Sequence, residues 1–239
     1  MTARIIDGKA FAAALRGYRL ASAGANKAQA EGLLAWLGGQ PNVLVVAPSS
    51  GIKTLAELIA QAKQKPGQLN YASAGTGSGT HINGEKFKLA AGIDVVHIPY
   101  KGTPEALTDT MAGRVTYYFS PISASAPFVR EGKLVALAVS TAKRSSVLPN
   151  VPTVAESGLP GFDYVLWVGM FAPAGTPPEI VDKIAHDIRT VAETADVKER
   201  FAALGAESMP MTPSEFKRFV DGEITDSAKV IKAAGIKAQ

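Results

Sequence analysis

Short apolar runs alternate with amphipathic segments from Asn42 onward, and this alternation constrains the fold more than any other feature of the 239-residue chain. Residues 42–47, NVLVVA, form a continuous β-branched run of the kind found in buried parallel strands. A capping box, Thr54-x-x-Glu57, then opens a segment with apolar residues at helical spacing. Alternating strands and helices predict an α/β architecture with parallel-rich sheets.

The same alternation continues along the chain. Further strands are predicted at residues 69–73, 95–98, 115–119, 134–139 and 164–171. Helices are predicted at 80–91 and 104–111, and after two more capping boxes at 176–179 and 212–215. Residues 1–40 do not share this pattern, because they are Ala-rich and end in Gly38-Gly39, which predicts a break.

The composition excludes several classes of function. Without any Cys, the chain forms no disulfide and uses no thiolate as nucleophile or ligand, and its three His residues lack the spacing of metal ligands. The net charge of +4 comes from Lys and Arg spread along the chain, which favours mild attraction for anions over nucleic-acid binding. No apolar run is long enough to span a membrane, and charged residues interrupt the start, so we expect neither membrane insertion nor a signal peptide.

A strand, a glycine loop and a helix follow one another in residues 71–81, YASAGTGSGTH. Glycines let backbone N–H groups approach a ligand, and the helix start adds unpaired donors and partial positive charge. This pattern indicates an anion site, and a turn needed only for strand-to-helix packing is the alternative. The spacing GxGxG, without a GK[ST] sequence, disfavours a dinucleotide fold or a P-loop.

A second loop, HIPYKGT at residues 97–103, follows the next predicted strand. Ligands of open α/β sheets collect at the carboxyl ends of strands, so this loop and the glycine loop are expected at one edge. Lys101 could attract a carboxylate and Thr103 could present helix N–H groups, although a simple cap and a solvated lysine explain them equally well. No nucleophilic elbow or pair of carboxylates points to catalysis.

The order and spacing of several segments resemble the Bug family, the substrate-binding proteins of tripartite tricarboxylate transporters. The segments that carry the resemblance are PNVLVV, KTLAELIAQAKQKPGQLNYASAGTGSGTH, HIPYKGTPEALTD, REGKLVALAVSTAKRS, LPNVPTVAESGLPGF, FAPAGTPPEIV and KAAGIK. The resemblance implies a periplasmic, two-lobed, type II binding-protein fold without cofactor or catalytic activity. It implies a small carboxylate as ligand and the membrane components of such a transporter as partners.

The resemblance also implies a division of the chain and a set of ligand contacts. The first lobe is expected at residues 41–70 and 165–239, the second at 71–164, with 1–40 as an atypical segment. The first lobe is expected to be incomplete, because the first-lobe ligand loop typical of the family is absent. The expected ligand-binding residues are Ser73, Ala74, Gly75, Thr76, Gly77, Ser78, His81, Tyr100, Lys101, Gly102, Thr103 and Ser120.

Two departures from the family pattern bear on function. Ser120 stands where many members have Asp, which favours a plain carboxylic acid over a ligand with an amino group. Residues 1–17, with IIDGKAFA, resemble the start of methylenetetrahydrofolate dehydrogenase/cyclohydrolase, although the Tyr-x-x-x-Lys of that active site is absent. A non-functional or partly folded fragment and a fragment of a folate or nucleotide enzyme are therefore the two alternatives.

Overall fold

The computed structural model describes residues 32–172, 175–207 and 211–236. The strands are β1 (Gly32–Val46), β2 (Asn70–Ser73), β3 (Val96–Pro99), β4 (Tyr117–Pro121), β5 (Val135–Val139) and β6 (Val165–Ala172). The helices are α2 (Leu55–Gln64), α3 (Gly79–Ala91), α4 (Thr103–Met111), α5 (Ile122–Arg130), α6 (Pro178–Ala192), α7 (Ala195–Ala203) and α8 (Pro213–Ala234), with a short 3-10 helix at Pro48–Ser50. The alternation predicted from the sequence is thus present, and α5 and α7 were not predicted.

The sheet is mixed rather than parallel-rich. Its strand order is β3-β2-β4-β1-β5, and β6 pairs with β1. The β2 strand is parallel to β3 and to β4, whereas β1 is antiparallel to β4, β5 and β6. The prediction of a parallel strand at residues 42–47 was therefore wrong in direction, although Val43 to Val46 are fully buried. A continuous apolar run indicates burial on both faces of a strand and does not determine the direction of its neighbours.

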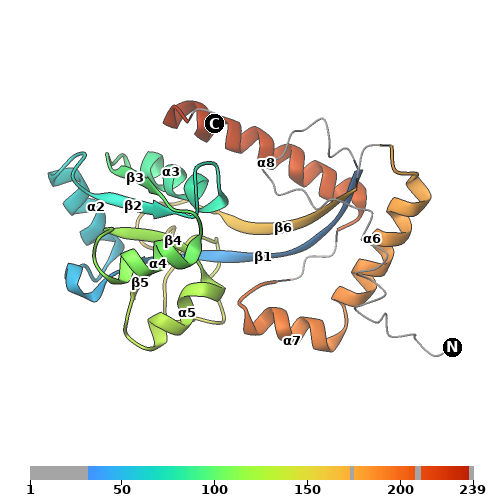
Figure 1. The fold of residues 1–239 in the computed structure, drawn as a ribbon, viewed down its shortest axis with the longest axis horizontal. Helices are drawn as coiled ribbons and strands as arrows, with labels where there is room; N and C mark the ends of the chain where they lie inside the picture. Colours follow the sequence, from blue (N-terminus) through green and yellow to red (C-terminus); the bar gives the residue numbers. More distant parts are fainter. Residues whose placement is uncertain (1–31, 173–174, 208–210, 237–239) are drawn as a thin grey trace.

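The longest strand, β1, joins the two halves of the molecule. Residues 32–41 pair with β6, and residues 42–46 continue into the sheet beside β4 and β5. Figure 1 shows β1 and β6 running together from one half to the other. The break expected at Gly38-Gly39 lies inside this strand, and a Cβ on Gly38 would lie 3.1 Å from the Phe201 ring. Residues 1–31, including the segment that resembles a folate enzyme, lie outside the described residues.

The main core contains residues on both sides of residue 70, where the lobe boundary was expected. One buried cluster joins Leu44, Leu55 and Leu58 to Tyr71, Phe119 and further apolar side chains between residues 44 and 162. Residues 44–69 thus share this buried cluster with residues 71–162. The physical reason is that α2 places its apolar face, which includes Leu55, Leu58 and Ala62, in this core.

The other half is built on β6 and the first part of β1. On β6, Met170 and Ala172 pack with Ile188 of α6, while Trp167 meets Phe216 of α8 edge-to-face. The predicted capping boxes at Thr54 and Thr212 are confirmed by reciprocal hydrogen bonds with Glu57 and Glu215. At α6 the N-cap is Pro177, one residue after the Thr176 predicted for that position.

Candidate functional site

Three helices begin at one edge of the sheet. The parallel strands β3, β2 and β4 are neighbours, so their carboxyl ends lie side by side. Each is followed by a helix: β2 by α3, β3 by α4 and β4 by α5 (Figure 1). The amino-terminal ends of helices offer unpaired N–H groups and partial positive charge. The expected glycine loop, the Tyr100 loop and Ser120 are therefore brought together at an edge suited to anions.

Internal hydrogen bonds fold the glycine loop tightly against the start of α3. The Ala74 N–H donates to Thr80 Oγ1 at 2.9 Å, and the Gly75 N–H donates to Ser73 Oγ at 3.1 Å. Ser78 is the N-cap of α3 and its Oγ accepts from the His81 N–H at 3.3 Å. Gly75 and Gly77 have φ values of 128° and 78°, in the region that favours glycine, which explains two of the three loop glycines.

Some amides of the loop and of the helix start have no hydrogen-bond partner. Within the described residues, the N–H groups of Thr76, Gly79 and Thr80 have no hydrogen-bond acceptor. Gly79 and Thr80 are the first two residues of α3, where a helix has unpaired donors, and the first turn of this helix contains no acidic residue. The start of α3 can therefore donate several hydrogen bonds to an anion without repulsion from its own side chains.

The Tyr100 loop is attached directly to the glycine loop. The Tyr100 N–H donates to the Ser73 carbonyl at 3.0 Å, and a Cβ on Gly75 would lie 3.4 Å from the Tyr100 carbonyl oxygen. The Thr103 hydroxyl, at the start of α4, lies 3.1 Å from the Tyr118 hydroxyl. Tyr118 also bonds the Thr80 hydroxyl, so a single buried tyrosine of β4 connects the starts of α3 and α4.

Neither Tyr118 nor Thr80 was among the residues expected at the site. Tyr118 lies within an apolar strand and has no local signal that distinguishes it from a core residue. Thr80 lies in the same run as the glycine loop, and its position next to the N-cap could have indicated it. Burial raises the pKa of Tyr118, so its hydroxyl is protonated at neutral pH and can donate a hydrogen bond to one threonine.

Two of the expected ligand residues, Ser120 and Lys101, differ in their burial. Ser120 is fully buried, and its Oγ donates to the Pro121 carbonyl at 3.3 Å. Lys101 is exposed at the loop tip. Beside them, Gln40 of β1 was not predicted, and its Oε1 accepts from the Ser123 N–H at 3.1 Å in the first turn of α5. Gln40 therefore occupies one amide in the first turn of α5.

The two histidines near the loop stack on each other, His81 buried and His97 half-buried. His81 and His97 have ring centroids 3.8 Å apart and an interplanar angle of 13°. His81 is only 3% exposed, and its Nδ1 accepts from the Gly77 N–H at 3.0 Å. His97 Nε2 lies 2.6 Å from Ser73 Oγ. His81 was expected among the ligand-binding residues, and its Nδ1 supports the loop.

Two cavities lie apart from these loops. One of about 310 Å³ lies between α3 and α8 and is lined by Ile82, Lys86, Tyr164, Glu223, Asp226, Ser227, Lys229 and Val230. The other, of about 250 Å³, is lined by Lys86, Ala90 and residues 159–162. None of the expected ligand residues lines either cavity. The donor groups at the sheet edge fit a small anion better than the larger cavity does, because Glu223 and Asp226 offset Lys86 and Lys229 in its lining.

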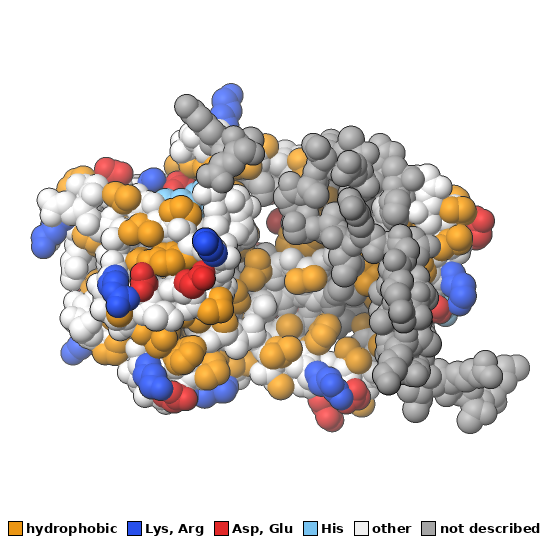
Figure 2. Space-filling model, viewed as in Figure 1, with side chains coloured by type: hydrophobic (Ala, Val, Ile, Leu, Met, Phe, Trp, Pro, Cys, Tyr) orange, Lys and Arg blue, Asp and Glu red, His pale blue; other side chains and the backbone are white. Residues whose placement is uncertain are grey.

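The charged side chains of the described residues are spread over the surface and are not gathered in one region. On the face shown in Figure 2, Lys and Arg side chains lie singly and next to Asp and Glu, without a basic stripe. Among the described residues, no group of three or more His, Asp and Glu side chains could hold a metal ion. Within the same residues, no helix combines the length and the apolar character needed to cross a membrane.

Residues 28–236 match the family described as the tripartite tricarboxylate transporter family receptor. The chain belongs to this family. Its members include BugT of Bordetella pertussis, which is 36% identical over 84% of this chain and 62% of its own length. The matched range contains the glycine loop, the Tyr100 loop and the strands β1 and β6. The match also includes residues 28–40, which the sequence analysis had set apart as atypical.

Solved structures support the same assignment and the periplasmic-binding-protein fold. An R. palustris protein solved with adipate has a TM-score of 0.82 and 33% identity, over 92% of this chain and 73% of that chain. MatC of Rhodopseudomonas palustris with bound malate has a TM-score of 0.76 and 32% identity, over 84% and 69% of the two chains. The chain spans between 52% and 62% of the length of three curated relatives in the receptor family.

Proposed function

We propose that this chain forms part of a receptor that captures a small carboxylate at the sheet edge where α3 and α4 begin. The observation that carries the proposal is the set of unpaired N–H groups of Thr76, Gly79 and Thr80. Hydrogen bonds from backbone N–H groups to a carboxylate are among the stronger ones because the acceptor is ionised. The family relatives solved with adipate and with malate support a carboxylate as the ligand.

The surroundings favour a ligand without an amino group. An amino group needs a carboxylate partner, and the nearby Asp109 is already bonded to Arg114 and to the Tyr100 hydroxyl. Ser120 supplies no charge at the end of β4. Glu105 in the first turn of α4 weakens that helix end as an anion site, so α3 is the main donor.

The cellular context follows from the family. The relatives include a protein described as the periplasmic binding protein BugD, which supports a periplasmic location and delivery of the ligand to the membrane components of a transporter. A binding role without catalysis agrees with a site made of backbone amides and hydroxyls, which bind anions but do not activate a nucleophile.

Isothermal titration with adipate, malate and citrate tests the proposal, with the uncharged adipamide as the matched ligand control. We expect heat of binding for at least one acid and none for adipamide. The substitution Thr103→Ala removes the hydroxyl that contacts Tyr118, and we expect the less firmly held start of α4 to lower the affinity for the acid. Thr108→Ala, on the exposed side of α4, is the control and should bind normally. No binding of any acid by a cooperatively folded chain would refute the proposal.

A further inference from the structure

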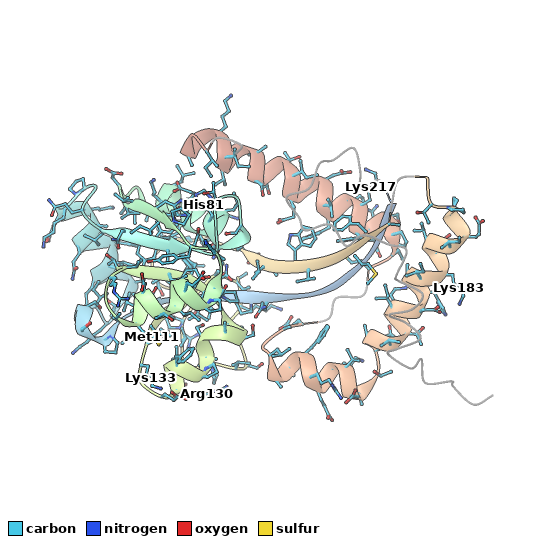
Figure 3. All side chains as sticks on the ribbon, in the orientation of Figure 1. His81, Met111, Arg130, Lys133, Lys183 and Lys217 are labelled. Atoms are coloured by element: carbon cyan, nitrogen blue, oxygen red, sulfur yellow. The ribbon has the colours of Figure 1, made fainter. Side chains whose placement is uncertain are left out.

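The glycine loop is fixed at two points by the stacked histidines. His81 Nδ1 accepts from the Gly77 N–H at 3.0 Å, near the tip of the loop. His97 Nε2 bonds Ser73 Oγ at 2.6 Å, and the same Oγ accepts from the Gly75 N–H at the base of the loop. Figure 3 shows His81 at the start of α3, within the half of the molecule that contains the sheet edge. The position of the unpaired amides thus depends on two histidine side chains.

The hydrogen bond at Gly77 requires a neutral His81. A backbone N–H can only donate, so Nδ1 must have no proton and the ring proton must be on Nε2. Protonation places a second donor opposite the Gly77 N–H and turns a contact of 3.0 Å into repulsion. The bond of His97 to Ser73 tolerates either state, because a hydroxyl can accept as well as donate. His81 is therefore the sensitive member of the pair.

The groups around His81 include one that raises its pKa and one that lowers it. Its own helix contributes Glu85 and Lys88, β3 contributes His97, β2 contributes Tyr71, and β4 contributes Tyr117 behind Tyr71. Burial lowers the pKa of His81 from its ordinary value, opposed by Glu85 and assisted by Lys88. Burial, with His81 and Lys88 as further causes, lowers the pKa of His97 to about 4. Both rings are neutral at neutral pH.

We propose that His81, supported by the stacked His97, is a positioning residue that keeps the glycine loop in its binding conformation only while its ring is neutral. Acidification then releases the Gly77 N–H and loosens the loop, so the affinity for the ligand decreases as the pH decreases. The direction of this pH dependence follows from the lowered pKa values of the two histidines. The native loop disfavours protonation of these rings, so acidification below the ordinary pKa of histidine acts against its conformation. This inference rests on the proposed carboxylate site and adds its regulation.

Affinity for the bound acid is measured from about pH 7.5 to about pH 4.5, across the titration range of histidine. His81→Asn places an amide oxygen near the position of Nδ1, so it can accept from Gly77 but does not titrate. His186→Asn removes an exposed histidine on α6 and is the matched control. Protonation of the ligand weakens all variants equally, so the informative quantity is the ratio between wild type and variant.

We expect wild type and His186→Asn to lose about fivefold more affinity than His81→Asn at the acidic end, the effect of one hydrogen bond. Equal pH profiles for all three proteins would overturn the inference. The Gly77 amide resonance provides a readout without ligand, and it should shift with the titration of the His81 ring in wild type only. A chain that binds no acid but shows this shift would disprove the carboxylate function while supporting the positioning role of His81.

Discussion

Glycines have different roles within a few residues of one another. Gly75 and Gly77 are required by positive φ values, whereas Gly84 lies in the middle of α3, where glycine normally destabilises a helix. A Cβ on Gly84 would overlap the ring of Tyr71, which is itself fully buried. This close approach lets α3 pack against β2 and brings Glu85 within 2.6 Å of the Tyr71 hydroxyl.

Gly84→Ala is expected to lower the free energy of unfolding by about 1 to 3 kcal/mol, because added volume in a packed core forces neighbours to shift. Urea unfolding followed by circular dichroism measures the change. Gly222→Ala is the matched control, since it also lies within a helix but a Cβ there meets no atom within 4 Å. The control should gain about 0.5 to 1 kcal/mol from helix propensity. Equal free energies of unfolding for the two variants would show that the Tyr71 ring moves aside without destabilising the protein.

Two helix starts were predicted from side-chain caps, whereas α5 was not predicted at all. The capping boxes at Thr54 and Thr212 are local patterns of four residues, and both are present. By contrast, α5 begins after Pro121 without a side-chain cap and contains Pro127, so its local signals favour a loop. Its formation depends on burial of Ile122 and Ala126 against the sheet. Local sequence therefore predicts side-chain caps, whereas α5 depends on tertiary packing.

Thr54→Ala is expected to destabilise the protein by about 1 kcal/mol, because the Glu57 N–H loses its acceptor at the start of α2. The same α2 helix contributes Leu55 and Leu58 to the main core, so the loss affects global unfolding. Chemical denaturation is the measurement. Thr54→Ser keeps the hydroxyl and should restore most of the stability, and a Ser variant as unstable as the Ala variant would exclude the cap as the cause.

The halves of the molecule are joined where β1 and the start of β6 pass each other. Ser140 lies at this crossing and is fully buried. Its Oγ accepts from the Asn42 N–H at 2.9 Å and donates to the Tyr164 carbonyl at 2.7 Å. One hydroxyl thus bonds β1 and the residue that precedes β6, and its bond to the Asn42 N–H is buried.

Ser140→Ala is expected to cost about 1 to 3 kcal/mol, because it leaves a buried backbone N–H and a carbonyl without their partner. Differential scanning calorimetry measures the resulting fall in melting temperature. Ser49→Ala, on the exposed 3-10 helix, is the control and should melt like wild type. A Ser140 variant that also melts like wild type would mean that water or a shifted backbone replaces both hydrogen bonds.

The sequence alone determined the succession of most strands and helices, the two confirmed capping boxes and the strand–glycine loop–helix unit. Those features depend on local hydrogen bonding and on the period of apolar residues, which are contained in short segments. Only the tertiary structure decided that β1 is antiparallel to its neighbours and crosses between the halves. It also decided that Tyr118 joins two helix starts and that His81 supports Gly77 while stacked on His97. Most of these partners are distant in the chain, and all depend on side-chain packing, which local pattern does not encode.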